Sequence, residues 1–256
     1  MRVRKAMALA SFLFCLSAFD SSGYAQTKTV CIPQFADGFD GQTFWQTQLL
    51  VDGRSFGVDR AVISVFGSRG QFFNRFTLGD FLFFNVFGQP VFMGPFTPFR
   101  FFNRDFLARP FRTGFLVIDS PLALNMRALI RRFSISGDLL SELVISPFDP
   151  FHRARLIEEE FDARILAFAM TNTDSLKRAL GRFDFFPLGA SDPLFSFPFE
   201  IGPRNQFSRF LFEVLPEVAS SGLRGTIRIT SDGLVSLLVL RVNGNEMQQV
   251  PLVIEE

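Results

Sequence analysis

The stretch RGTIRITSDGLVSLLVLRVNG, residues 224–244, decides the fold class of this chain. Residues 226–230 alternate between apolar and polar side chains, which is typical of a half-buried β-strand. The Ser-Asp-Gly sequence at 231–233 predicts a turn, because all three residue types favour turn conformations. Residues 234–242 are mostly apolar and rich in valine and leucine, and they predict a second strand.

The residues that follow extend this pattern. Asn243-Gly244 predicts a tight hairpin, since both residue types tolerate a positive φ angle. The sequence EMQQVPLVI at 246–254 then predicts a last strand. Three strands in so short a stretch indicate a β-meander.

A similar pattern occurs earlier in the chain. Residues 114–132 form a strand-turn-strand sequence that parallels residues 225–241. Residues 44–55 and 161–174 correspond in the same way, because each is a strand that runs into a polar turn. A repeat spaced by about 110 residues indicates duplicated domains rather than a solenoid of short repeats.

We therefore expect two modules of similar size. The stretch SPFDPFHRAR at 146–155 predicts their boundary, because prolines and polar residues interrupt the strand pattern there. The first module then covers residues 26–147 and the second covers residues 148–256. Many short strands with frequent turn residues predict an all-β fold of two tandem immunoglobulin-like antiparallel β-sandwich domains.

Helical patterns are weak in this sequence. Residues 174–183 and 208–218 are the two candidate helices. The second candidate begins at Ser208 as a capping residue and ends at Pro216, so it predicts at most two turns.

The N-terminal residues have the three parts of a secretory signal peptide. Basic residues open the chain, Ala6–Phe19 is apolar, and Gly23-Tyr24-Ala25 provides a small-residue cleavage site. Cys15 would be the acylated residue of a lipoprotein, but the bulky Phe14 before it does not suit such a site. We expect residues 1–25 to be removed and the mature protein to be secreted.

The mature chain is expected to be close to neutral. Cleavage removes three of the 26 basic and one of the 25 acidic residues, so the formal charge changes from +1 to −1. A nucleic-acid binder needs a basic surface, and we therefore expect no nucleic-acid partner. No later stretch reaches the ~20 apolar residues of a membrane-spanning helix, so we expect none after cleavage.

Four segments carry a resemblance to a known group of proteins. They are PQFADG (33–38), WQTQLLV (45–51), SGDLLSELVISP (136–147) and the stretch at 224–244. Together they resemble exported bacterial proteins of unassigned function that are built from two repeated β-sandwich modules. The resemblance implies this fold and an extracellular, periplasmic or cell-surface location. It implies no catalytic residue.

Catalytic motifs are lacking in the sequence. A hydrolytic triad needs a base beside its nucleophile, and the one histidine, His152, lies in the expected linker. GSRG at 67–70 lacks the Gly-x-Ser-x-Gly spacing of a nucleophile elbow and predicts a polar hairpin turn. Phosphate-binding and dinucleotide-binding motifs are absent. We expect a protein that is not an enzyme and has no cofactor.

Metal ligands and disulfides are also scarce. Cys31 is the single thiol of the mature chain and cannot form an internal disulfide. The acidic run EEEFD at 158–162 could supply two or three oxygen ligands to a calcium ion between the modules, so a calcium site is an alternative. A solvated strand edge explains such a run better, since its spacing matches no dedicated calcium loop. We therefore predict no metal site.

Phenylalanine is unusually frequent, with 37 residues in the chain and a dense group at 72–106. Alternation along strands would bury about half of this group and turn the rest outward. An outward apolar patch marks a surface that binds a partner or lies near a membrane. The residues predicted for this surface are Trp45, Phe81, Phe83, Phe87 and Phe92.

These observations favour a non-catalytic secreted protein that mediates extracellular or cell-surface interactions with an unknown protein or surface polymer. An outer-membrane β-barrel is an alternative, because export, many strands and abundant aromatic residues are common to both classes. A weak carbohydrate-binding module that uses Trp45 is another. The position of Trp45 at a strand start favours packing between sheets over a sugar-binding role.

Overall fold

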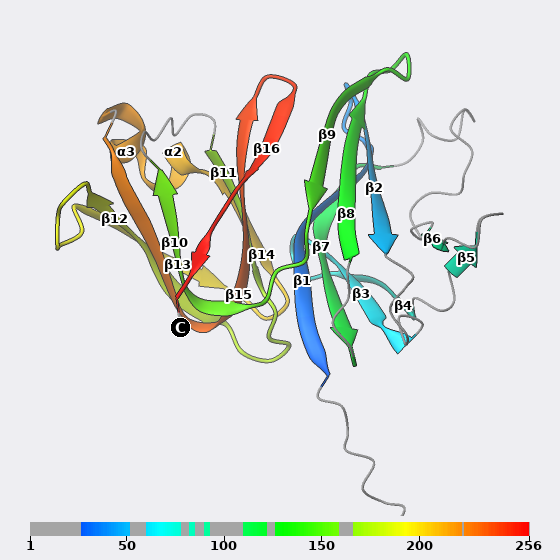
Figure 1. Cartoon of the computed structure of the whole chain (residues 1–256), viewed down its shortest axis with the longest axis horizontal. Helices are drawn as coiled ribbons and strands as arrows, with labels where there is room; N and C mark the ends of the chain where they lie inside the picture. Colours follow the sequence, from blue (N-terminus) through cyan, green and yellow to red (C-terminus); the bar gives the residue numbers. More distant parts are fainter. Residues whose placement is uncertain are drawn as a thin grey trace, which may run out of the picture.

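The computed structural model describes residues 27–51, 60–77, 82–84, 90–92, 110–121, 126–158, 166–221 and 223–255 (Figure 1). These parts of the chain are mostly β-strand, with little helix, and form two large antiparallel sheets. The all-β prediction is therefore confirmed. Phe81 and Phe87, together with residues 1–25, lie outside the described residues.

The seven-stranded sheet has the strand order β4-β3-β7-β1-β2-β8-β9. Its strands are β1 (Lys28–Phe39), β2 (Phe44–Val51), β3 (Val62–Gly67), β4 (Phe72–Thr77), β7 (Arg112–Ser120), β8 (Met126–Phe133) and β9 (Leu139–Ile145). The short strands β5 (Leu82–Phe84) and β6 (Pro90–Phe92) pair with each other.

The eight-stranded sheet is arranged around β15. One path runs β13-β12-β15-β10-β17, while β11 and β16 also pair with β15, and β14 pairs with β11. The elements are β10 (Phe151–Glu158), β11 (Leu166–Asn172), β12 (Ala179–Pro187), β13 (Phe195–Ile201), β14 (Gln206–Phe210), α2 (Leu211–Val214), α3 (Pro216–Ser221), β15 (Gly225–Asn243), β16 (Glu246–Val250) and β17 (Val253–Ile254).

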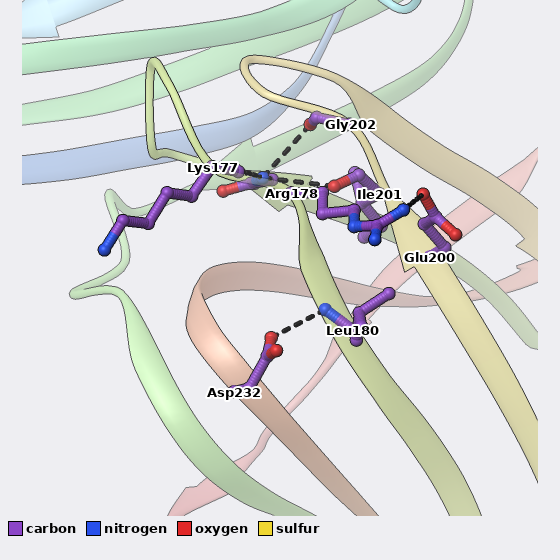
Figure 2. A network of polar contacts seen from close by, with 8 residues as sticks. Lys177, Arg178, Leu180, Glu200, Ile201, Gly202 and Asp232 are labelled. Carbon is purple, nitrogen blue, oxygen red and sulfur yellow. Dashed lines mark hydrogen bonds and ion pairs between the residues drawn. The ribbon is translucent and has the colours of Figure 1, made fainter.

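Strand β15 is one continuous strand, so the predicted turn at 231–233 and the meander are wrong. Its first part, up to Ser231, pairs with β10 and β12. Residues 235–241 pair with β11 and residues 239–243 pair with β16, while Val235 also lies opposite Phe151 of β10. The polar residues mark this change of partners. Asp232 Oδ1 accepts a hydrogen bond from the Leu180 N–H at 2.7 Å, which satisfies the backbone of β12 there (Figure 2).

A hairpin follows β15 as predicted, but its loop consists of residues 244–245 and not of Asn243-Gly244. Asn243 pairs with Glu246, and Gly244 has a φ angle of +59° at the first position of the two-residue loop. The last predicted strand is divided in two, because Pro251 has no N–H to donate to a ladder. Residues after it pair with β10 as β17.

The two candidate helices have different outcomes. Residues 174–183 are not helical, because Asp174 Oδ1 accepts the N–H groups of Leu176 and Lys177 in a turn and β12 begins at Ala179. The second segment contains α2 and α3. Ser208 belongs to β14 and is not the cap; Glu213 accepts the Phe210 N–H at 2.7 Å instead. Pro216 begins α3 rather than ending a helix.

The expected linker at 146–155 is strand from Phe151 onward. Before it, Phe148 exchanges backbone hydrogen bonds with Cys31 of β1, at 2.7 and 2.9 Å. His152 therefore lies on β10 and not in a linker, and its side chain is exposed. Its Nδ1 lies 3.2 Å from the carbonyl oxygen of Ser231.

Each sheet buries its own group of apolar side chains. In the eight-stranded sheet the ring of Phe183 lies 5.4 Å from that of Phe168 and 5.3 Å from that of Phe199. A fully buried phenylalanine contributes roughly 1.5–3 kcal/mol. Outward rings also occur, since Phe72 of β4 is 60% exposed. The abundant phenylalanines are thus divided between core and surface.

The two sheets meet through buried side chains. Strand β9 lies beside β16 at this junction, and β1 contacts β11 and β15 (Figure 1). Ala169 and Leu238 of the eight-stranded sheet belong to the same buried cluster as Ile130 and Leu143 of the other sheet. None of the helices in the described part of the chain has the length and apolar character needed to cross a lipid bilayer.

Candidate binding groove between the sheets

A groove with a volume of about 390 Å³ lies where the two sheets meet. Strands from both sheets form its walls, and most of the lining side chains are apolar or aromatic. The lining residues are Gln34, Ala36, Trp45, Phe111, Thr113, Ile130, Leu143, Ala167, Phe168, Ala169, Ser208, Arg209, Phe210, Glu213, Leu240 and Met247. Its volume lies within the range of ~300–1,000 Å³ that is usual for small-ligand sites.

The groove exists because strands of the eight-stranded sheet present small residues to the other sheet. Ala167 and Ala169 of β11 lie opposite Leu240 and Leu238 of β15, so all four side chains project from the same face. The alanines leave space in front of β11. Leu240 and Met247 supply the apolar floor beside that space.

Trp45, the only tryptophan in the chain, is held firmly in the groove wall. Its indole Nε1 donates to Asp40 Oδ2 at 2.8 Å, and its ring centroid lies 6.2 Å from that of Phe111. The Arg132 guanidinium lies 5.6 Å from the indole centroid and donates to Asn245 Oδ1 of the other sheet. The indole N–H is therefore already bound within the protein.

Asp40 remains a carboxylate down to low pH. Partial burial acts to raise its pKa, but hydrogen bonds from Trp45, Thr43 and Gln42 outweigh burial and lower the pKa to about 2. Its charge therefore fixes the indole at any physiological pH. This rigidity makes Trp45 a fixed wall of the groove.

Aromatic rings form the solvent-facing rim of the groove. Phe111 is 42% exposed and Phe210 is 38% exposed. Phe210 also stacks on Phe212 with centroids 5.5 Å apart. Charged groups beside these rings are Arg209 and Glu213. A bound partner would thus meet apolar surface inside and polar groups at the entrance.

Polar contacts near the groove fix the relative position of the sheets. The Gln206 side-chain amide donates to the carbonyl of Pro33 and, at 2.9 Å, to Gln34 Oε1. The Gln206 N–H donates to the Ser68 carbonyl at 3.2 Å. These bonds connect β14 directly to β1 and to the turn after β3.

A buried thiol lies at the same junction. Burial raises the pKa of Cys31 from its ordinary value of 9.0 to about 12, against the opposing effects of Ser236, Thr171 and Arg204. The protonated thiol is inert, so Cys31 has a packing role. The Phe66 and Phe115 rings beside it are stacked 5.2 Å apart.

The predicted surface residues are only partly placed by the structure. Trp45 lines the groove, whereas Phe83 and Phe92 lie on β5 and β6 and are not among the residues that line it. The groove residues Ala167, Leu240 and Met247 were not predicted. The signal that could have identified the second wall is the unbroken apolar run at 237–240, which indicates a strand buried on both faces.

The other candidate sites can also be placed. GSRG at 67–70 forms the polar hairpin turn between β3 and β4 that the sequence predicts, with the Gly67 N–H donating to the Gln71 carbonyl at 2.7 Å. Glu158 ends β10, and residues 159–162 of the acidic run lie outside the described residues. In the described ranges no three His, Cys, Asp or Glu side chains are grouped to hold a metal ion.

The chain matches no family model, no curated protein and no solved structure. The resemblance to exported proteins with two β-sandwich modules therefore stays a prediction. The groove and its surroundings are the observations that bear on function.

Proposed function

We propose that this protein is a secreted, non-catalytic protein of two tandem immunoglobulin-like modules that binds a partner through the groove between its sheets. The observation that carries this proposal is the groove itself. It is apolar inside, is rimmed by exposed aromatic rings, and takes its walls from both sheets. Concave apolar surface with a few polar groups at its edge is characteristic of binding sites.

The strand pairings support the duplication in this proposal. The order β4-β3-β7-β1 corresponds to β13-β12-β15-β10, and the order β2-β8-β9 corresponds to β11-β15-β16. Two glycines at equivalent places are equally crowded. A Cβ on Gly114 would lie 1.9 Å from the Phe66 carbonyl oxygen, and one on Gly225 would lie 2.1 Å from that of Phe186.

An apolar segment of a protein partner fits the groove better than a sugar does. Sugar-binding sites present a free aromatic face and free polar groups. Here the Trp45 indole is covered by Arg132 and its N–H is bound to Asp40. The aromatic rim instead suits apolar side chains of a protein partner, which are removed from water on binding. Each methylene group buried in this way contributes about 0.8 kcal/mol to the binding free energy.

Trp45 provides a direct test, because all indole fluorescence of the protein comes from the groove wall. The dye anilinonaphthalene sulfonate, which has apolar rings and one negative charge, should quench Trp45 emission by energy transfer in a saturable manner. Met247→Glu places a negative charge in the groove and should remove most of this transfer. Leu188→Glu is the matched control, since Leu188 is 82% exposed and does not line the groove. Equal transfer in both variants would contradict the proposal.

Export and the lack of catalysis need separate measurements. Cell fractionation should recover a protein that begins at Gln26 outside the cytoplasm. Turnover of a polysaccharide or peptide by the purified mature chain in a broad hydrolase screen would show that the protein is an enzyme.

A further inference from the structure

The solvent-exposed face of the eight-stranded sheet carries arginines on neighbouring strands. Strand β15 runs between β10 and β12, and Thr230 lies opposite Arg153 on one side and opposite Arg182 on the other. Residues directly opposite each other in an antiparallel pair project from the same face. The two arginines therefore flank Thr230, with Cα atoms about 10 Å apart from the usual strand spacing.

The carboxylates that pair with arginines on this face lie at the next row of residues. It consists of Arg155, Arg228 and Asp184, again in register across the three strands. Asp184 is bound by Arg182 at 2.7 Å and accepts the Ser196 hydroxyl at 2.6 Å. Glu255 pairs with Arg155 and lies 3.8 Å from Arg228.

Arg153 has no carboxylate partner in this arrangement. Its side chain is exposed, and none of the carboxylates in the described ranges pairs with it. Arg228 is only loosely paired. Its buried Nε, the atom that lies 3.8 Å from Glu255, has no hydrogen-bond acceptor among the described residues, and its guanidinium lies 4.7 Å from the centre of the Phe186 ring.

Two adjoining hollows meet at these residues. One has a volume of about 460 Å³, and Arg153, Arg182, Arg228 and Thr230 line it together with Asp184 and Glu255. The other, of about 440 Å³, shares Arg153, Arg182 and Thr230 and adds His152 and Asp232. The first hollow holds three guanidinium groups against two carboxylates and keeps one positive charge.

We propose that Arg153 and Arg182, with Arg228 beside them, form a binding site for an oxyanion above Thr230. Each guanidinium has five N–H donors and no acceptor, so a site with this surplus suits a ligand with acceptors only. A carboxylate, sulfate or phosphate group has that chemistry and matches the arginine fork. Asp232 lines only the second hollow and accepts the Leu180 N–H (Figure 2). The anion therefore lies on the Arg228 side.

Isothermal titration at fixed ionic strength tests this site in the mature protein. Inorganic sulfate, inorganic phosphate and glucuronate are the three probes, and at least one should give a saturable heat. Arg153→Gln should weaken its binding by about tenfold, as expected for the loss of a charged hydrogen bond. Arg153→Lys keeps the charge but loses the fork, and it should recover part of the affinity.

Arg178→Gln is the matched control for the loss of one charge. Arg178 lies on the same half of the chain, binds Glu200 at 3.1 Å and lines neither hollow (Figure 2). Its replacement should leave binding unchanged, and circular dichroism should show that all variants fold. A lack of saturable heat with all three probes would overturn the site. Equal weakening by Arg153→Gln and Arg178→Gln would do the same, since it would indicate non-specific charge attraction.

Discussion

Cys31 is a single buried residue at the junction of the sheets whose ionisation makes the stability of the protein depend on pH. The sequence predicts that Cys31 forms no internal disulfide, and the structure shows it free and buried. Its surroundings include Thr171 and Ser236, which are distant in the chain. No local pattern around residue 31 specifies those neighbours. Its raised pKa is therefore a consequence of tertiary packing alone.

The free energy of unfolding should fall as pH rises above about 9. The folded-state pKa of Cys31 is about 12 and the ordinary value is 9.0, so the unfolded chain loses the thiol proton first. The folded state is thereby disfavoured, by up to about 1.4 kcal/mol per pH unit. Urea unfolding between pH 8 and about 11 should show this slope, and Cys31→Ala should reduce it. An unchanged slope in the variant would contradict the assignment.

At the scale of elements, the sequence predicts the strand conformation of β15 but not its continuity through residues 231–233. Alternation at 226–230 and the apolar run at 234–242 correctly predict strand on both sides of Ser231-Asp232-Gly233. These three residues have turn chemistry, so a hairpin was expected. The neighbouring strands decide otherwise, because each part of β15 already has partners on both sides. Pairing of this kind is not encoded locally.

Asp232 should contribute to the free energy of unfolding, because it accepts a backbone N–H of β12 at the point where β15 changes partners. Asp232→Ala leaves the Leu180 N–H without its acceptor and should cost about 1 kcal/mol of unfolding free energy. Asp192→Ala is the control, since the contact of Asp192 is with the adjacent Ser191. Urea unfolding followed by circular dichroism measures both variants. Equal losses would mean that the Asp232 bond contributes nothing specific.

At the scale of the whole molecule, the sequence predicted two similar units but not the surface between them. Leu238 and Ala169 look like ordinary strand residues, yet they share a buried cluster with side chains of the other sheet. Trp45 was predicted to pack between sheets, and it lies partly buried against the cluster that both sheets share. Its place in a groove depends on Leu240 and Met247, about 200 residues further along the chain. Periodicity within a strand cannot specify such contacts.

The two sheets should unfold together. Trp45 fluorescence reports on the seven-stranded sheet and far-ultraviolet circular dichroism on both, and the two transitions should coincide. Leu238→Ala should destabilise by about 2–5 kcal/mol and shift both signals equally, although Leu238 lies in the other sheet. Leu237→Ala is the control, since Leu237 is a buried leucine of the cluster formed by residues 151–250 alone. If Leu238→Ala leaves the Trp45 transition in place, the sheets unfold independently.

The central position of β15 also affects the order in which the chain can fold. Strands β10, β11 and β12 all need residues 225–243 as a partner, and these residues are synthesised after them. A nascent chain therefore holds three incomplete strands until β15 emerges, and contacts between residues so far apart form slowly. That delay suits the export proposed above, because a translocation channel passes unfolded polypeptide, and it would make the second half of the chain depend on chaperones during the same interval.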